Sequence, residues 1–428
     1  MSAYLNKHYN KCRLRIQGGI NEKGVIMNTA SSVRKPKRYI KTGPLVTGYA
    51  LARMKPLHAL LPNEVRYNLP ISWNWRMLST FIGSGRRNVY IDVHTKLDAP
   101  PSYEPAVKSD PRWAMSEAEI RRFWECGFAG PFKLLEPGEM RQVAPRLWQL
   151  WERDSRTYPR NSYVYVGSTT KGTDTTELDN EAYARKGLNA RDKHLEDNEL
   201  MSLYAHPAIV ERMAQLLGPD LLLWRSQFFP KYPGMGGTGW HQATSYLNET
   251  FRTATLTPKN LRKLFQLTAW VAVTDSTVKN GCMRFIPGTH LELLPMGVED
   301  YDPVKHAGNK HDRFGTKVMR PAVGELEKQA VNMEMKAGEF VIFSERTMHG
   351  ALPNVTADDA RLGMSARYIV PDVEIHNPWV LGEGGLSIAY LQIKNLNLDR
   401  WKIVQLQGNR KGPMADRVIP MPEGARRC

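Results

Sequence analysis

Two histidines and two arginines in the second half of the chain have the types and spacing that chemistry needs. His241 stands in the run GWHQA, His349 follows about a hundred residues later, and Arg361 and Arg367 come soon after it. Neutral imidazoles bind iron and other divalent metals. The planar guanidinium of arginine pairs with a carboxylate through two parallel hydrogen bonds. These residues therefore predict a metal centre with a carboxylate-binding arginine beside it.

Each of these residues also has a purely structural interpretation. A histidine beside Trp240 is more often a packed or surface side chain than a metal ligand. The chain has 11 histidines, so two of them can fall into such a pattern by chance. Arg367 could pair with a surface acid, and Trp270 could be a core residue of an alternating strand. Only the residues around both histidines can decide between these interpretations.

A histidine at a strand end, a second one about a hundred residues later and an arginine a dozen residues further on resemble the jelly-roll oxygenases that use iron and 2-oxoglutarate. Most of those enzymes complete the metal site with a carboxylate two residues after the first histidine. That position is Ala243 here, and the next acid is Glu249. A methyl group opens one coordination position and removes one negative charge, which favours an external anion such as chloride.

The motifs around both histidines extend this likeness. They are FFPKYPG at 228–234, GTGWHQA at 237–243, NGC at 280–282, FIPGT at 285–289 and MKAG at 335–338. They resemble the nonheme iron halogenases of the phytanoyl-CoA dioxygenase superfamily, in the group typified by the threonine halogenase of syringomycin biosynthesis. The likeness runs from about residue 115 and weakens after 375.

The resemblance implies a role for each matching position. It implies that His241 and His349 bind Fe(II) and that Ala243 lines the halide position. It implies these surrounding groups: Arg361, Thr238, Trp270 and Phe229 for 2-oxoglutarate, and Asn248, Thr268 and Arg367 in the hydrogen-bonded network that supports the halide. Three substrate-facing positions depart from the threonine enzyme, namely Gln227, Tyr246 and Glu345. These exchanges move charge and bulk in the pocket, so the resemblance leaves the substrate open.

The elements expected to position these residues change type near residue 220. Helices are predicted after the capping box Ser116–Glu119, over 138–153 and over 206–217, whereas short apolar strands follow at 221–224, 227–229, 267–273, 282–286, 340–343 and 362–370. This order predicts a mainly β sandwich or barrel with flanking helices. The resemblance specifies a double-stranded β-helix, the jelly-roll or cupin-like core. The proline-rich run 98–105 predicts a boundary, with a basic N-terminal extension at 1–110 and the catalytic domain at 111–428.

The chain is strongly basic, with a formal net charge of +16. Residues 1–60 hold twelve Lys or Arg and a single acid, Glu22. This excess indicates either attraction to a polyanion, such as an acidic carrier protein or a phosphorylated metabolite, or a solvated tail. Aromatic residues are not interleaved with the charges, which argues against nucleic acid. No apolar run predicts a membrane span or a signal peptide, and four scattered cysteines without a C-x-x-C pair fit a reducing cytoplasm rather than a disulfide framework or zinc site.

Together these features predict an Fe(II)- and 2-oxoglutarate-dependent enzyme that uses dioxygen and chloride to replace an unactivated C–H bond by C–Cl. Its expected substrate is an aminoacyl or acyl group on a carrier protein, or a free anionic small molecule, in the biosynthesis of a specialised metabolite. One alternative is a hydroxylase or other dioxygenase of the same superfamily, with water in the vacated position. Another is a non-catalytic binding protein built on a decayed oxygenase fold, against which the second histidine and both arginines argue.

Overall fold

The computed structural model describes Thr47, Ala182 and residues 75–85, 87–89, 96–100, 102–168, 185–242, 256–300, 313–314, 317–375, 391–394 and 396–425. The twelve Lys and Arg residues of positions 1–60 lie outside these ranges. So do three predicted site residues, Ala243, Tyr246 and Asn248. What the sequence predicts for them stays a prediction.

Helices flank the strands of the core in the described part of the chain. Among them are α6 (Glu117–Cys126), α7 (Pro137–Glu152), α9 (Asn198–Tyr204) and α10 (Pro207–Leu217). The helices α6, α7 and α10 confirm predicted helices. The predicted capping box opens α6, because the Ser116 side chain accepts from the Glu119 backbone N–H and the Glu119 carboxylate accepts from the Ser116 N–H. Gly127 ends α6 in the left-handed region at φ 88°.

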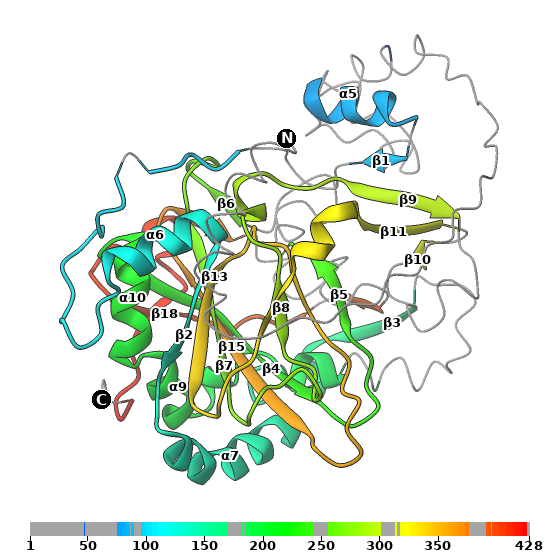
Figure 1. Ribbon diagram of the computed structural model, residues 1–428. Helices are drawn as coiled ribbons and strands as arrows, with labels where there is room; N and C mark the ends of the chain where they lie inside the picture. Colours follow the sequence, from blue (N-terminus) through cyan, green and yellow to red (C-terminus); the bar gives the residue numbers. More distant parts are fainter. Residues whose placement is uncertain are drawn as a thin grey trace.

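The core consists of two sheets that pack against each other (Figure 1). The larger has the order β19-β18-β4-β15-β7-β13-β2 and the smaller β12-β8-β14-β5. The larger comprises β2 (Phe128–Lys133), β4 (Leu221–Lys231), β7 (Gln266–Ala272), β13 (Glu339–Ser344), β15 (Arg361–Ile369), β18 (Ile403–Gln407) and β19 (Val418–Pro420), and the smaller β5 (Thr238–His241), β8 (Met283–Phe285), β12 (Val331–Met333) and β14 (His349–Ala351). Their pairings are antiparallel except β18 with β19. The predicted mainly β jelly-roll core with flanking helices is confirmed.

Smaller elements surround this core. They are α5 (Trp75–Gly83), β1 (Asn88–Val89), β3 (Val164–Ser168), β6 (Leu256–Pro258), β9 (Met296–Asp300), β10 (Arg313–Phe314), β11 (Lys317–Pro321), β16 (Val373–Ile375) and β17 (Leu391–Lys394), with 3-10 turns at Arg160–Ser162, Lys193–Leu195, Thr289–Leu291, Gly324–Gln329 and Gly412–Met414. β1 pairs with β9, and Arg76 forms an ion pair with Glu292 at 2.7 Å. Residues before position 110 thus contact residues far beyond it, while the division of the chain there stays a prediction.

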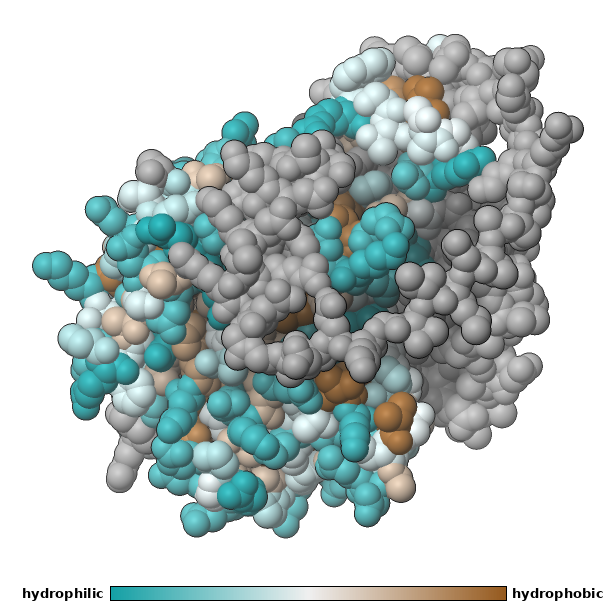
Figure 2. Space-filling model, in the orientation of Figure 1, coloured by the Kyte–Doolittle hydropathy of each residue, from teal (hydrophilic) through white to brown (hydrophobic). Residues whose placement is uncertain are grey.

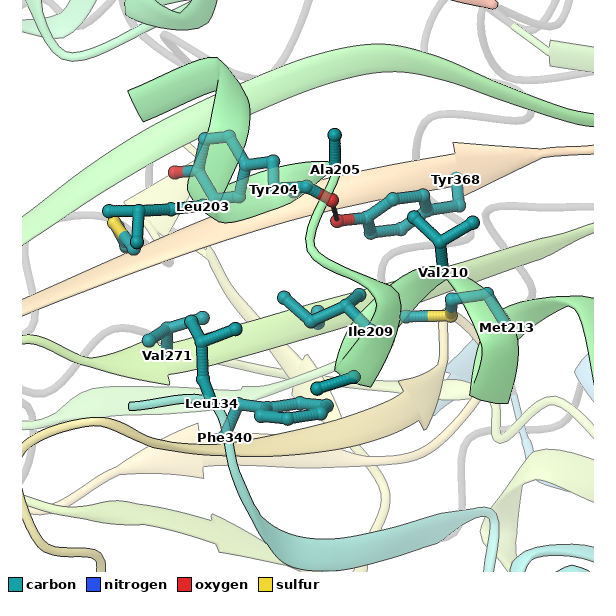
Figure 3. Packing of buried hydrophobic residues seen from close by; sticks show 14 of the residues in the cluster. Leu134, Leu203, Tyr204, Ala205, Ile209, Val210, Met213, Val271, Phe340 and Tyr368 are labelled. Carbon is teal, nitrogen blue, oxygen red and sulfur yellow. Dashed lines mark hydrogen bonds between the residues drawn. The ribbon is translucent and has the colours of Figure 1, made fainter. Parts of the chain in front are cut away.

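The outer face of the larger sheet is apolar and is covered by helices. Residues of α10 such as Ile209 and Met213 pack toward Val271 of β7 and Phe340 of β13 (Figure 3). Tyr368 lies beside them, and its hydroxyl donates to the backbone oxygen of Tyr204 at 2.8 Å. Burying each large apolar side chain contributes roughly 1.5–3 kcal/mol to folding. This layer therefore holds the strands that carry the site on their other face.

One predicted pair of strands was wrong. The sequence predicts separate strands at 221–224 and 227–229, but β4 runs without interruption from Leu221 to Lys231. Pro230, expected to stop the strand, lies opposite Leu362 of β15. On its other edge β4 pairs with β18 only at Leu221–Leu223. A residue without an N–H is tolerated in such a position because no ladder bond is lost.

The remaining features of the described residues are the polarity of the surface and the state of two cysteines. Figure 2 shows a face that is mostly hydrophilic where residues are described, with small separate hydrophobic areas. Among the described residues, no helix combines the length and apolarity that a membrane crossing needs. Cys282 is free and buried, whereas Cys126 is disulfide-bonded. One disulfide therefore does form, which spacing along the chain cannot reveal.

Candidate metal centre

The two predicted metal-binding histidines lie side by side. β5 and β14 are neighbours in the smaller sheet, and His241 and His349 are directly paired in their register. The centroids of the two rings are 4.2 Å apart, with an angle of 51° between the planes. Paired residues of adjacent strands point to the same face of a sheet. The fold thus brings together two imidazoles that are far apart in the sequence.

Hydrogen bonds set the tautomer of both rings. His241 Nδ1 lies 2.9 Å from the backbone oxygen of Gly239, and His349 Nδ1 lies 2.8 Å from that of Thr347. A carbonyl oxygen can only accept, so each Nδ1 carries a proton and each neutral ring keeps its lone pair on Nε2. This arrangement is typical of histidines that bind a metal through Nε2.

The surroundings keep His349 neutral. Burial, followed by the neighbouring His241, holds the pKa of His349 well below its usual range. Phe343 packs against the His349 ring with centroids 4.7 Å apart, whereas His241 is exposed. Where the structure describes the chain, no group of three or more His, Cys, Asp or Glu side chains could hold a metal. Among the described residues, the donors are therefore a pair of neutral imidazoles, which suit Fe(II) with open coordination positions.

The inner face of the larger sheet brings most of the other predicted residues together. Side chains alternate between faces along a strand, so the register of β4, β15, β7 and β13 decides which ones share a face. Arg367 lies opposite both Arg225 and Thr268, and Ser365 lies opposite both Gln227 and Trp270. The inner face thus carries these groups: Arg225, Gln227, Phe229 and Lys231 on β4, Arg361, Ser365 and Arg367 on β15, Thr268 and Trp270 on β7.

Arg361 is a buried cation whose free N–H groups could bind an anion. Its side chain is 2% exposed, and its Nε and Nη1 atoms have no hydrogen-bond partner. Its guanidinium lies 5.1 Å from the centre of the Trp270 ring. Burial lowers its pKa to about 10, so it remains charged at neutral pH. Buried donors are normally satisfied, and a carboxylate of 2-oxoglutarate fits these orphaned N–H groups.

Gly363 is a site-forming residue that sequence reasoning missed. A Cβ atom there would lie 2.0 Å from Cζ2 of Trp270, which no side chain tolerates. The glycine lets the indole lie flat against β15, beside Arg361. A glycine inside a predicted strand was the available signal.

Glu345 is a buried acid near His349 in the sequence. It is 1% exposed, and its Oε1 atom has no hydrogen-bond partner. The Ser344 hydroxyl lies 3.4 Å from its other oxygen. Burial raises the pKa of Glu345 to about 7, against a smaller opposing effect of Arg346. Of the other predicted pocket and cosubstrate residues, Gln227 and Phe229 are partly buried and Thr238 is exposed.

The fold and this site define a class: a jelly-roll protein with a two-histidine metal centre and a buried arginine on the facing sheet. Residues 123–362, more than half of the chain, match the model of the phytanoyl-CoA dioxygenase (PhyH) family. The chain belongs to this family of dioxygenases.

The chain shares about a quarter of its residues with two curated relatives over the parts that match. The chain is 25% identical to dioxygenase lolE1 of Epichloe uncinata over 170 residues, which are 40% of this chain and 54% of the relative. It is 24% identical to the ectoine dioxygenase of Halomonas elongata over 223 residues, 47% of this chain and 65% of the relative. It therefore spans less than two thirds of either. The structure of CytC3 with Fe(II) and alpha-ketoglutarate is 28% identical with a TM-score of 0.48, over 71% of this chain and 92% of CytC3.

Proposed function

We propose that this protein is an Fe(II)- and 2-oxoglutarate-dependent halogenase that replaces an unactivated C–H bond by C–Cl. The observation that carries the proposal is a donor set of two neutral imidazoles combined with alanine at position 243. The two rings are 4.2 Å apart. Position 243, where an acid ordinarily completes the site, offers only a methyl group.

Charge explains why chloride suits such a site. Neutral imidazoles leave the full positive charge of Fe(II) uncompensated by protein ligands, and a bound cation is the largest local charge in its surroundings. An external anion supplies the negative charge that a carboxylate otherwise brings. A coordination position beside a methyl group is open to it. Thr268, Asn248 and Arg367 are the residues we assign to hydrogen bonds that support this anion.

Other residues hold the cosubstrate and orient the two histidines. Bound iron, 2-oxoglutarate and dioxygen supply the oxidising chemistry. Arg361 binds the far carboxylate of 2-oxoglutarate, with Trp270 flanking its guanidinium and Phe229 and Thr238 at the edge of the pocket. The Nδ1–carbonyl bonds of the two histidines hold the rings in the orientation that a metal requires.

We propose a carrier-tethered aminoacyl or acyl group, or a free anionic small molecule, as the substrate. The net charge of +16 supports both, because a basic protein attracts an acidic carrier or an anionic metabolite. Gln227, Tyr246 and Glu345 are the residues we assign to the substrate pocket.

The decisive test compares Ala243→Asp with Ala243→Gly. Candidate carrier-bound and free substrates are incubated with Fe(II), 2-oxoglutarate and oxygen, with and without chloride, and the products are read by mass spectrometry. We expect a chlorine isotope doublet from the wild type and from Ala243→Gly, and at most hydroxylation from Ala243→Asp. Hydroxylated product alone from the wild type in chloride would instead favour a hydroxylase of the same family.

A further inference from the structure

Lys231 is a buried cation that the proposed function has not yet used. It ends β4 directly opposite Arg361, the first residue of β15. Only 5% of its side chain is exposed. Cross-strand partners point to the same face, so two cationic side chains project together from one end of the inner face.

No acid compensates these charges in the described part of the chain. Neither residue forms an ion pair there, and no carboxylate influences the pKa of either group. Burial, followed by repulsion from Arg361, lowers the pKa of Lys231 to about 8. Among the described residues, the only other titratable group that acts on both is the Cys282 thiol, whose pKa burial raises to about 11. Two adjacent buried cations without a counter-ion are costly, which indicates a place for an anion.

The ammonium group is held firmly but keeps one donor. Nζ donates to the backbone oxygens of Leu352 at 2.7 Å and Gly236 at 3.1 Å. An ammonium has three N–H groups, so one remains. The same two bonds connect the segment before β5 to the segment after β14, the two strands that carry His241 and His349. The lysine stem also packs tightly, since a Cβ at Gly281 would lie 2.6 Å from its Cδ.

We infer that Lys231 is a second cosubstrate-binding residue, which donates its remaining N–H to the same carboxylate of 2-oxoglutarate that Arg361 binds. This inference rests on the proposed function, since it assumes that 2-oxoglutarate occupies the site. It makes the pocket selective for 2-oxo acids that have a distal carboxylate, because only those bring a negative charge to both cations.

The test is an anaerobic titration of the Fe(II)-loaded protein. Binding is measured through the visible charge-transfer band that a bound 2-oxo acid produces. It compares 2-oxoglutarate with 2-oxobutyrate, which lacks the distal carboxylate. For Lys231→Met we expect the Kd of 2-oxoglutarate to rise about 10-fold, as for loss of one charged hydrogen bond. The Kd of 2-oxobutyrate should stay the same, and Lys231→Arg should restore much of the affinity for 2-oxoglutarate.

The matched control is Lys279→Met, which makes the same chemical change at an exposed lysine in the neighbouring loop. It should leave both constants unchanged. Equal weakening of both 2-oxo acids in Lys231→Met would show that Lys231 only holds the two segments together, and an unchanged Kd for 2-oxoglutarate would also overturn the inference. A wild-type protein that binds iron but gives no band with 2-oxoglutarate would instead refute the proposed function.

A pH series adds a readout that a structural role would not produce. Because the protonated ammonium binds the carboxylate, the wild-type Kd of 2-oxoglutarate should rise as the pH passes about 8, the pKa to which burial and Arg361 lower Lys231. In Lys231→Arg the same range should leave the Kd flat, since arginine stays charged. A wild-type Kd that is also flat would contradict the inference.

Discussion

The two faces of β7 and β15 differ in the side chains that they carry: apolar residues on the outer face and several polar or charged residues on the inner face. On the outer face Met364 and Val271 are fully buried among apolar residues that pack against the helices. On the inner face of the same strands, Ser365 and Arg361 are equally buried but carry polar atoms without hydrogen-bond partners. Neighbouring residues of one strand are thus buried to a similar degree. They differ in whether they carry polar atoms that lack hydrogen-bond partners within the protein.

The outer face contributes to the free energy of folding, whereas the inner face provides polar groups that can bind a ligand. Apolar burial on the outer face needs nothing further and stabilises the folded chain. Unsatisfied buried donors and acceptors on the inner face cost stability until a ligand satisfies them. Substitutions should therefore separate into two groups according to the face, and the predictions below test that separation.

The largest effect is expected at the metal pair. His349→Ala removes one of the two imidazoles, so iron binding and the charge-transfer band with 2-oxoglutarate should be lost while the circular dichroism spectrum is retained. Metal analysis after anaerobic loading measures this. His206→Ala is the matched histidine control, because His206 caps α10 by accepting from the Ala208 N–H and should affect stability alone. Full iron content in His349→Ala would refute the assigned ligand.

On the outer face the effect should fall on stability alone. Met364→Ala leaves a cavity in the layer beneath α10, so the free energy of unfolding should fall by about 2–5 kcal/mol. Chemical denaturation measures this change. The Kd of 2-oxoglutarate for the folded variant should remain that of the wild type. A loss of affinity comparable to that of an inner-face variant would mean that the two faces are not separable.

Glu345 should make stability depend on pH. Its pKa is raised to about 7, so the folded protein holds a proton that the unfolded chain, with an ordinary pKa near 4.5, has released. The contribution is fully present below the unfolded value and is lost as the pH rises to about 7, by up to about 3 kcal/mol. Glu345→Gln cannot titrate, and its free energy of unfolding should decline less over this window. Parallel declines in both proteins would contradict the assignment.

The smallest effect is expected at Ser365, the neighbour of Met364 on the opposite face. Its buried hydroxyl has no hydrogen-bond partner, so Ser365→Ala gives up nothing within the protein. The free energy of unfolding should rise, or change by less than about 0.5 kcal/mol. Denaturation beside Met364→Ala provides the direct contrast, and a destabilisation as large as that of Met364→Ala would break the comparison.

Local signals in the sequence predicted much of the fold. The capping box at Ser116 and the left-handed glycine at 127 act within a single turn, so α6 could be predicted from neighbouring residues. The strands carrying Trp270 and Arg361 were predicted from short apolar runs, and the structure confirms them with ends shifted by one residue. The sequence predicts two strands in place of β4 because a proline usually ends a strand. Pro230 is accommodated because β18 pairs with β4 only at Leu221–Leu223, and the local sequence does not contain this pairing.

The site divides in the same way. Spacing and motifs singled out His241 and His349, and the register of β5 and β14 places them in contact. Lys231 and Gly363 escaped notice because their importance arises from the residue on the facing strand, Arg361 and Trp270 respectively. Cross-strand register pairs residues of two different strands, so the residue pattern of one strand cannot predict it.

The proposed centre is a metal held by two imidazoles with a halide in place of a protein carboxylate. The most direct measurement is an anaerobic crystal structure with Fe(II), 2-oxoglutarate and bromide, with anomalous data collected at the bromine and iron edges. We predict an iron peak between His241 and His349 and a bromine peak bonded to it, beside the methyl group of Ala243. A protein oxygen at that coordination position, or no iron between the two rings, would rule out the proposed centre.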